Sequence, residues 1–139
     1  MKIFYTAVAT ATGGGREHGH VRSSDGIIDA AIEAPVELGG KGGATNPEQL
    51  FAAGYSACFL NALRRVGRKA QANVDGAEVT ADVGIGPTGE GAFGLAVTLH
   101  VTLPNVERGR GEELLAAAHR VCPYSNATRG NIDVVLDLR

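Results

Sequence analysis

The chain contains two cysteines, Cys58 and Cys122, which lie far apart in the sequence. Cysteine thiolates attack peroxides and disulfides and bind soft metals. A pair of thiols therefore has three interpretations: unrelated buried thiols, metal ligands, or a redox pair that closes a disulfide. A disulfide kept only for stability is unusual in a cytosolic chain of this size. Which of the three interpretations applies depends on what surrounds each sulfur.

Cys58 lies in the middle of an apolar stretch, residues 53–59, which is predicted to be helical. Free cysteine is often an inert buried side chain, and apolar surroundings oppose formation of the reactive thiolate. A reactive Cys58 therefore requires a cation. The candidates are Arg16, in a glycine-rich loop, and Arg64 and Arg65, further along the same predicted helix. Arg65 is seven positions away, about 10 Å along the helix axis, which is far for a direct contact.

Glu48 is the natural partner for Arg16, because an isolated buried guanidinium is costly. Arginine can donate two N–H bonds to a carboxylate and still present another N–H to a thiolate. Glu48 lies in the first turn of the predicted helix that carries Cys58. Each residue also has a simpler explanation when it is taken alone. Arg16 fits a solvated loop residue, and Glu48 fits a negative charge at the positive end of a helix.

Cys122 follows a second predicted helix and is either an inert last-turn thiol or a resolving cysteine. A sulfenic acid formed on one thiol condenses readily with a neighbouring thiol. The metal interpretation rests on His119, three positions before Cys122, with Cys58 and His18 or His20 as further ligands. Zinc sites usually contain closely spaced paired ligands, and one His-x2-Cys pair is a weak signal. The sequence therefore predicts no metal.

An α+β domain is predicted to position these residues, with elements in the order β-β-β-α-β-β-α-β. Alternating apolar residues predict strands over 3–11, 79–85, 95–103 and 132–138, and a hairpin over 20–32 with its turn at 23–26. A glycine run at 13–15 is predicted to end the first strand. Asn46 and Pro47 open a helix that runs to about Lys69. A second helix is predicted over 106–121 and is stopped by Pro123.

Length and charge limit the function classes further. The 139 residues fit one domain, 1–139, and 44% hydrophobic with 20% charged residues is ordinary for a globular protein. The formal net charge of −2 argues against a nucleic-acid partner, which requires a basic excess. The longest apolar stretch, 50–63, is too short and too mixed to span a bilayer. We therefore expect a cytoplasmic protein without a membrane partner.

Three segments carry a resemblance to a known family. Residues 39–59 read GGKGGATNPEQLFAAGYSACF, residues 121–131 read VCPYSNATRGN, and residues 12–16 read TGGGR. The first two resemble the signatures of the organic hydroperoxide resistance proteins, and the third resembles their arginine loop. These proteins are one branch of the OsmC/Ohr superfamily. The similarity runs essentially from end to end, although His18-Gly19-His20 is less typical after the arginine.

The resemblance implies a fold, an activity and a set of roles. It implies two antiparallel sheets around a buried helix, in an intertwined homodimer with active sites at the subunit interface. It implies a peroxidase for alkyl and fatty-acid hydroperoxides that holds no bound cofactor and is recycled by an external dithiol. That dithiol is a dihydrolipoyl group, often carried on a lipoylated protein. The implied roles are peroxidatic for Cys58, resolving for Cys122, and activation of the thiolate by Arg16 and Glu48.

An apolar wall would favour alkyl hydroperoxides over hydrogen peroxide, and Phe51, Tyr55 and Phe59 are candidates for it. Ordinary core packing explains these three side chains equally well. Two rivals to the main prediction remain. One is the sister OsmC branch, a peroxidase with broader stress-response roles. The other is a non-enzymatic binder of small apolar ligands whose two cysteines act as a redox switch, which predicts at most one turnover per chain.

Overall fold

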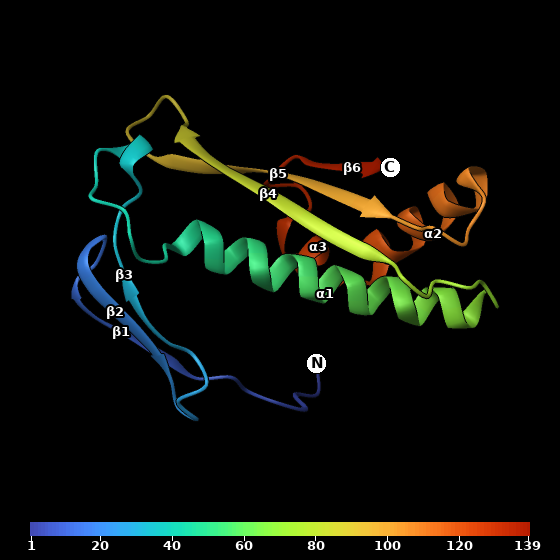
Figure 1. Cartoon of the computed structure of the whole chain (residues 1–139), viewed down its shortest axis with the longest axis horizontal. Coiled ribbons are helices and arrows are strands. Elements are labelled where there is room, and N and C mark those ends of the chain that lie inside the picture. Colours follow the sequence, from blue (N-terminus) through green and yellow to red (C-terminus); the bar gives the residue numbers. More distant parts are fainter. The chain divides into compact units, whose positions relative to one another are not determined.

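The computed structural model describes residues 1–139, which form two compact units, Met1–Leu50 and Phe51–Arg139. Figure 1 shows the elements coloured along the chain. The predicted α+β class is confirmed, with six strands, three α-helices and one short 3-10 helix. In chain order these are β1 (Ala9–Gly14), β2 (Glu17–Ser23), β3 (Asp29–Ile32), η1 (Val36–Leu38), α1 (Pro47–Lys69), β4 (Glu78–Pro87), β5 (Phe93–Thr102), α2 (Arg108–Val121), α3 (Pro123–Thr128) and β6 (Val134–Leu138).

The first unit contains an antiparallel sheet in the order β1-β2-β3. The prediction that the glycine run ends the first strand was wrong. β1 begins at Ala9 and continues through Gly13 and Gly14, which pair with Gly19 and Glu17 across a register shift. Glycine tolerates this irregular pairing because it has no Cβ, and Gly13 adopts a φ of +79°. The strand therefore delivers the chain directly to the turn that holds Arg16.

Helix α1 has the bounds that the sequence predicts. The side chain of Asn46 accepts a hydrogen bond from the backbone N–H of Gln49 at 2.9 Å, and this caps the first turn. Pro47 occupies the first helical position, where its missing N–H costs nothing. The helix buries one side, at spacings of three and four residues, through Tyr55, Phe59, Ala62, Leu63 and Gly67.

The second unit contains a sheet in the order β4-β5-β6, and here the topology corrects a prediction. β4 and β5 pair antiparallel as expected, but β6 pairs parallel with β5. A parallel pair needs a crossover connection, and α2 and α3 supply it. On β5 the residues Val97, Leu99 and Val101 are buried, while His100 lies on the opposite face.

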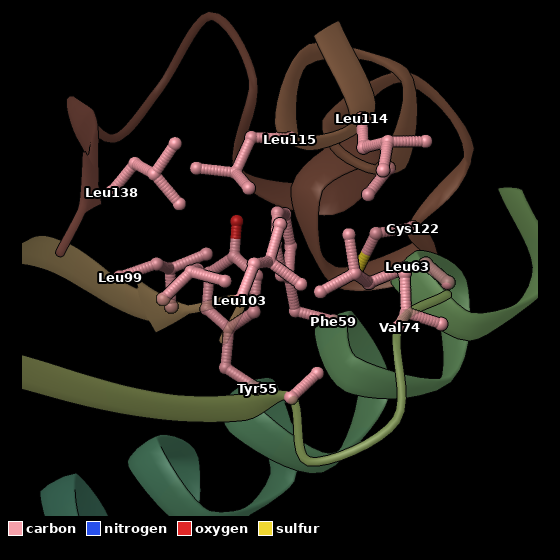
Figure 2. Close-up of a cluster of buried hydrophobic side chains, with 14 of the residues drawn as sticks. Tyr55, Phe59, Leu63, Val74, Leu99, Leu103, Leu114, Leu115, Cys122 and Leu138 are labelled. Carbon is pink, nitrogen blue, oxygen red and sulfur yellow. The ribbon is translucent and has the colours of Figure 1, made fainter. Parts of the chain in front are cut away.

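One buried cluster forms the core of the second unit, and Figure 2 labels ten of its side chains. Its members come from α1, from the segment between α1 and β4, from β5 and the residue after it, from α2 and the residue after it, and from β6. The largest fully buried side chains in it are Tyr55, Phe59, Leu63, Leu99 and Val101. Cys122 belongs to the same cluster, and its sulfur lies inside it. The core thus fixes the position of one of the two thiols.

The predicted end of the second helix before Pro123 is confirmed, and Pro123 also has an effect that was not predicted. The second helix does end just before it, at Val121, but Pro123 then opens α3 as its first residue. Cys122 is the only residue between the two helices and has an extended backbone, with φ −66° and ψ 124°. None of the helices combines the length and the apolar character that a membrane span requires.

Candidate active site

The structure brings the two cysteines together within the second unit. The Sγ atoms of Cys58, on α1, and Cys122, between α2 and α3, are 3.7 Å apart, and both thiols are free. A disulfide bond is about 2.0 Å long, so small side-chain movements are enough to join them. Cys122 is fully buried, whereas Cys58 is only partly buried. Cys58 is therefore the thiol that a molecule from solvent reaches first.

The immediate surroundings of Cys58 do not favour the thiolate. Burial raises the pKa of the Cys58 thiol most strongly, a hydrogen bond from the backbone N–H of Tyr124 lowers it, and the Cys122 thiol raises it. The net effect is a pKa above the ordinary value. Because none of these groups is a cation, the second unit alone leaves Cys58 mostly protonated at neutral pH. This agrees with the requirement for a cation that the sequence indicates.

A set of buried hydroxyls holds the segment that follows Cys122. The phenol oxygen of Tyr55 lies 3.0 Å from Ser125 Oγ and 3.3 Å from Thr128 Oγ1, both on α3. The ring of Tyr124 packs 5.6 Å from the ring of Tyr55 and rests on α1 at Gly54, where an added Cβ would lie 2.8 Å from the Tyr124 hydroxyl. Sequence reasoning missed these contacts. Ser125 and Thr128 stand in the second signature, but their spacing from Tyr55 gives no signal of contact.

Arg16 and Glu48 meet within the first unit. The guanidinium donates two hydrogen bonds to the carboxylate, at 3.0 and 2.5 Å. These bonds lower the pKa of Glu48 and raise that of Arg16, and burial opposes both shifts. The Glu48 side chain is 12% exposed and the Arg16 side chain 40% exposed, so part of the guanidinium remains available to a further acceptor. The backbone carbonyl of Arg16 also accepts a hydrogen bond from Ala34 N–H at 2.7 Å, which ties the turn to the chain after β3.

The other cations named as candidates are placed differently. Arg64 is exposed. Arg65 lines a groove of about 580 Å³ between α1 and α2, together with Lys69, Arg110 and Arg120. Neither Arg64 nor Arg65 is among the groups that shift the pKa of Cys58.

The candidate metal ligands do not form a recognisable site. No group of three or more His, Cys, Asp and Glu side chains is arranged to hold a metal ion. His20 contacts Asp29, and His119 has a lowered pKa because it is partly buried and near Arg129. Among the predicted wall residues, Tyr55 and Phe59 are fully buried in the core and Phe51 is partly buried against it. Their role as a substrate wall stays a prediction.

The comparison with known proteins bears on this arrangement of thiols and charges. The family model described as "OsmC-like protein" matches residues 40–137, which include both cysteines and Glu48. The chain belongs to the OsmC-like protein family. The match also crosses the boundary between the two compact units.

Relatives within the family are similar over the whole chain. An organic hydroperoxide resistance protein of Xanthomonas axonopodis pv. citri is 51% identical over 99% of this chain and 96% of its own length. A crystal structure of an organic hydroperoxide resistance protein from Elizabethkingia anophelis has a TM-score of 0.94 and 50% identity, covering 99% and 98% of the two chains. The structure of OhrB of Bacillus subtilis has a TM-score of 0.89 and 43% identity, covering 99% and 100%. The predicted resemblance is confirmed.

Proposed function

We propose that this protein is a thiol-dependent peroxidase that reduces organic hydroperoxides to alcohols. The observation that carries the proposal is the 3.7 Å separation between the partly exposed Cys58 sulfur and the buried Cys122 sulfur. A second support is that several relatives of 43 to 51% identity are named organic hydroperoxide resistance proteins. The reducing cytoplasm, where thiols stay available, is the compartment that we propose for the reaction.

The proposed chemistry has two steps, an oxidation of Cys58 by the hydroperoxide and a condensation with Cys122. The Cys58 thiolate attacks the distal oxygen of the hydroperoxide, the O–O bond breaks, and the alcohol leaves after it takes up one proton. Cys58 is then a sulfenic acid. The Cys122 thiol condenses with it, an S–S bond forms, and water leaves. The protein has lost two hydrogens in total, and the hydroperoxide has become an alcohol and water.

Activation of the thiolate is the part that the pair of Arg16 and Glu48 would supply. The bidentate contact leaves guanidinium N–H groups free, and these can bind a thiolate and polarise a peroxide. Glu48 orients the guanidinium and balances its charge. Glu48 and Cys58 stand ten positions apart on α1, about 15 Å along the axis, so the carboxylate does not itself reach the sulfur on its own helix.

We propose that the active form is a homodimer in which a second copy completes each site. All six residues of β1 are exposed, although a strand without any buried residue contributes nothing to a core. Large apolar side chains are also exposed, among them Phe4 at 90%, Tyr5 at 78% and Phe93 at 72%. Burying such surface against a partner is favourable and is typical of obligate dimers.

Recycling requires a reductant, which we propose to be a small or protein-bound dithiol such as a dihydrolipoyl group. One thiolate of the donor attacks the Cys58–Cys122 disulfide, and its second thiolate resolves the mixed disulfide. The donor leaves as a cyclic disulfide, and both protein thiols are restored. Cys58 is the sulfur open to attack, because Cys122 is fully buried.

The test is the intact mass after one equivalent of cumene hydroperoxide, for the native chain and for Cys122→Ser. We expect the native protein to lose two hydrogens, and the variant to gain one oxygen on Cys58. If neither protein changes mass, the peroxidase proposal is wrong. Arg16→Ala is expected to react much more slowly while it keeps its fold, and unchanged second-order kinetics would remove Arg16 from the mechanism.

Turnover separates this proposal from the rivals. With dihydrolipoamide in excess, a peroxidase consumes many equivalents of hydroperoxide per chain, whereas a redox-switched ligand binder consumes at most one. Rates for an alkyl hydroperoxide and for hydrogen peroxide, measured side by side, distinguish an enzyme for organic substrates from a general stress peroxidase. Equal rates for the two oxidants would favour the general one.

A further inference from the structure

Helix α3 carries two groups that contact Cys58 and yet has only six residues. Cys122 is the residue immediately before its first turn, and its sulfur lies 3.7 Å from that of Cys58. The backbone N–H of Tyr124, in that turn, lowers the pKa of the Cys58 thiol. An isolated helix of this length is unstable in water, so another part of the protein must hold it.

We propose that the hydroxyl of Tyr55 is the group that holds α3 against α1, so that Tyr124 N–H and the Cys122 thiol both face Cys58. Tyr55 is thus a positioning residue for thiolate formation and for disulfide closure. The inference deepens the proposed function and rests on it. It assigns Tyr55 a role different from that of a substrate wall.

Burial makes the Tyr55 hydroxyl an anchor rather than a surface contact. Tyr55, Ser125 and Thr128 are buried, so bulk solvent does not reach their hydroxyls. A buried hydroxyl without a partner is costly, so the side chains remain paired. The ring of Tyr55 is held in turn by an edge contact with Phe51, with centroids 5.9 Å apart and planes at 85°. The oxygen therefore projects toward α3 from a fixed position.

The hydrogen bonds can be assigned so that every hydroxyl proton is used. Thr128 Oγ1 lies 3.0 Å from the carbonyl of Tyr124 and 3.2 Å from that of Ser125, so its single proton stays within α3. Thr128 therefore accepts from Tyr55, whose hydroxyl donates to it. Tyr55 in turn accepts from the Ser125 hydroxyl at 3.0 Å. This chain of donors fixes the middle and the C-terminal end of α3 to one atom of α1.

Helix geometry connects this anchor to the reacting sulfur. Tyr55 precedes Cys58 by three positions, and side chains at this spacing project from the same side of a helix. The phenol and the thiol of α1 therefore meet the same short helix. The phenol binds Ser125 and Thr128 of α3, and the thiol receives the N–H of Tyr124. Removing the phenol oxygen leaves the ring packing in place but frees α3 to move away from the sulfur.

The experiment compares Tyr55→Phe with the native protein by the pH dependence of Cys58 alkylation with iodoacetamide, in a Cys122→Ser background. If α3 loosens, the thiol loses its N–H donor and its pKa rises. If the pKa of the thiol rises by one, the thiolate fraction at neutral pH falls about tenfold, and the alkylation rate falls with it. The matched control is Thr80→Val, which removes a hydroxyl from an exposed side chain of β4 that makes no side-chain hydrogen bond. It should alkylate at the native rate.

Disulfide closure gives a second readout, with both cysteines present. After one equivalent of cumene hydroperoxide, Tyr55→Phe should retain a sulfenic acid that dimedone traps, at least tenfold more than the native chain retains. Thermal unfolding confirms that the variant is folded. If Tyr55→Phe proves unstable, Ser125→Ala, which keeps the phenol and removes one of its partners, is measured in its place. It should shift the alkylation profile in the same direction.

The proposal is wrong if a folded variant shows the native alkylation profile and the native rate of closure. This outcome is distinct from failure of the peroxidase proposal. Alkylation requires no peroxide, so a native chain that ignores cumene hydroperoxide would end the peroxidase proposal and leave the alkylation comparison decisive for Tyr55.

Discussion

Oxidation is expected to stabilise this protein substantially, and the size of the effect follows from the positions of the two cysteines. Cys58 and Cys122 are 64 positions apart, so their disulfide closes a long loop. The chain-entropy relation for a loop of this length gives a stabilisation of about 4 kcal/mol, as an upper value that native-state strain reduces. The sulfurs already lie 3.7 Å apart, and only small movements are needed to join them. We therefore expect little strain.

The stabilisation converts into a melting shift. With an unfolding entropy of about 2.1 cal/mol/K per residue, 139 residues give about 290 cal/mol/K, and about 4 kcal/mol corresponds to a rise of about 10 to 15 °C. The assay is thermal unfolding followed by circular dichroism, for fully reduced protein and for protein treated with one equivalent of cumene hydroperoxide. Protein concentration is held constant, because association also shifts the midpoint.

Cys122→Ser is the matched control, because it keeps Cys58 reactive and cannot close the loop. Its midpoint should not rise on treatment. Non-reducing electrophoresis shows whether the native disulfide is within one chain. A native protein whose mass shows the loss of two hydrogens, without a rise in its midpoint, would refute the reasoning. The disulfide would then not be the link between Cys58 and Cys122 that the folded structure prepares.

Three further predictions concern stability. His100 lies between the carboxylates of Asp137 and Asp82, which raise its pKa. Its stabilising contribution is therefore present below pH about 6.5 and is lost as the pH rises through the raised pKa. In urea unfolding, His100→Asn should abolish this pH dependence. Gly67→Ala should lower the free energy of unfolding by about 1 to 2 kcal/mol despite its better helix propensity, because the new Cβ would lie 2.8 Å from Val74. Denaturant titration should show a smaller loss for the same change in a Val74→Ala background. Arg16 lowers the pKa of Glu48. The native protein should therefore have a higher free energy of unfolding than Glu48→Gln above pH about 4.3, and this difference should disappear as the pH falls further. A difference that persists at pH 2 would contradict this.

The elements near the cysteines were predictable because local signals define them. Asn46 and Pro47 mark the start of α1 by their side-chain chemistry, and the alternation from Val97 to Val101 marks β5. The first strand was misplaced because the glycine rule is a local propensity, and pairing with β2 overrode it. The direction of β6 was also missed, since apolar alternation is the same in parallel and antiparallel strands.

The candidate site also has parts that the sequence predicts and parts that only the fold reveals. The types of Cys58 and Cys122 suggested redox chemistry, but only the fold shows that their sulfurs are 3.7 Å apart. The partnership of Arg16 with Glu48 followed from the cost of a buried charge and is confirmed as a bidentate contact. The backbone N–H of Tyr124 could not have been predicted, because every residue except proline carries one and only tertiary structure selects which one meets a thiol.

The parallel pairing of β6 with β5 also sets the order in which the molecule can be assembled. β4 and β5 are neighbours in sequence and can pair early, whereas β6 must wait until the whole crossover connection has closed. During synthesis on the ribosome, Leu138 cannot pack against Gly111 of α2 until residues 134–138 have emerged. Before that moment the crossover helices can contact α1 and β5 but lack their packing against β6. The surroundings of the thiol pair are therefore complete only when the last strand has joined the sheet.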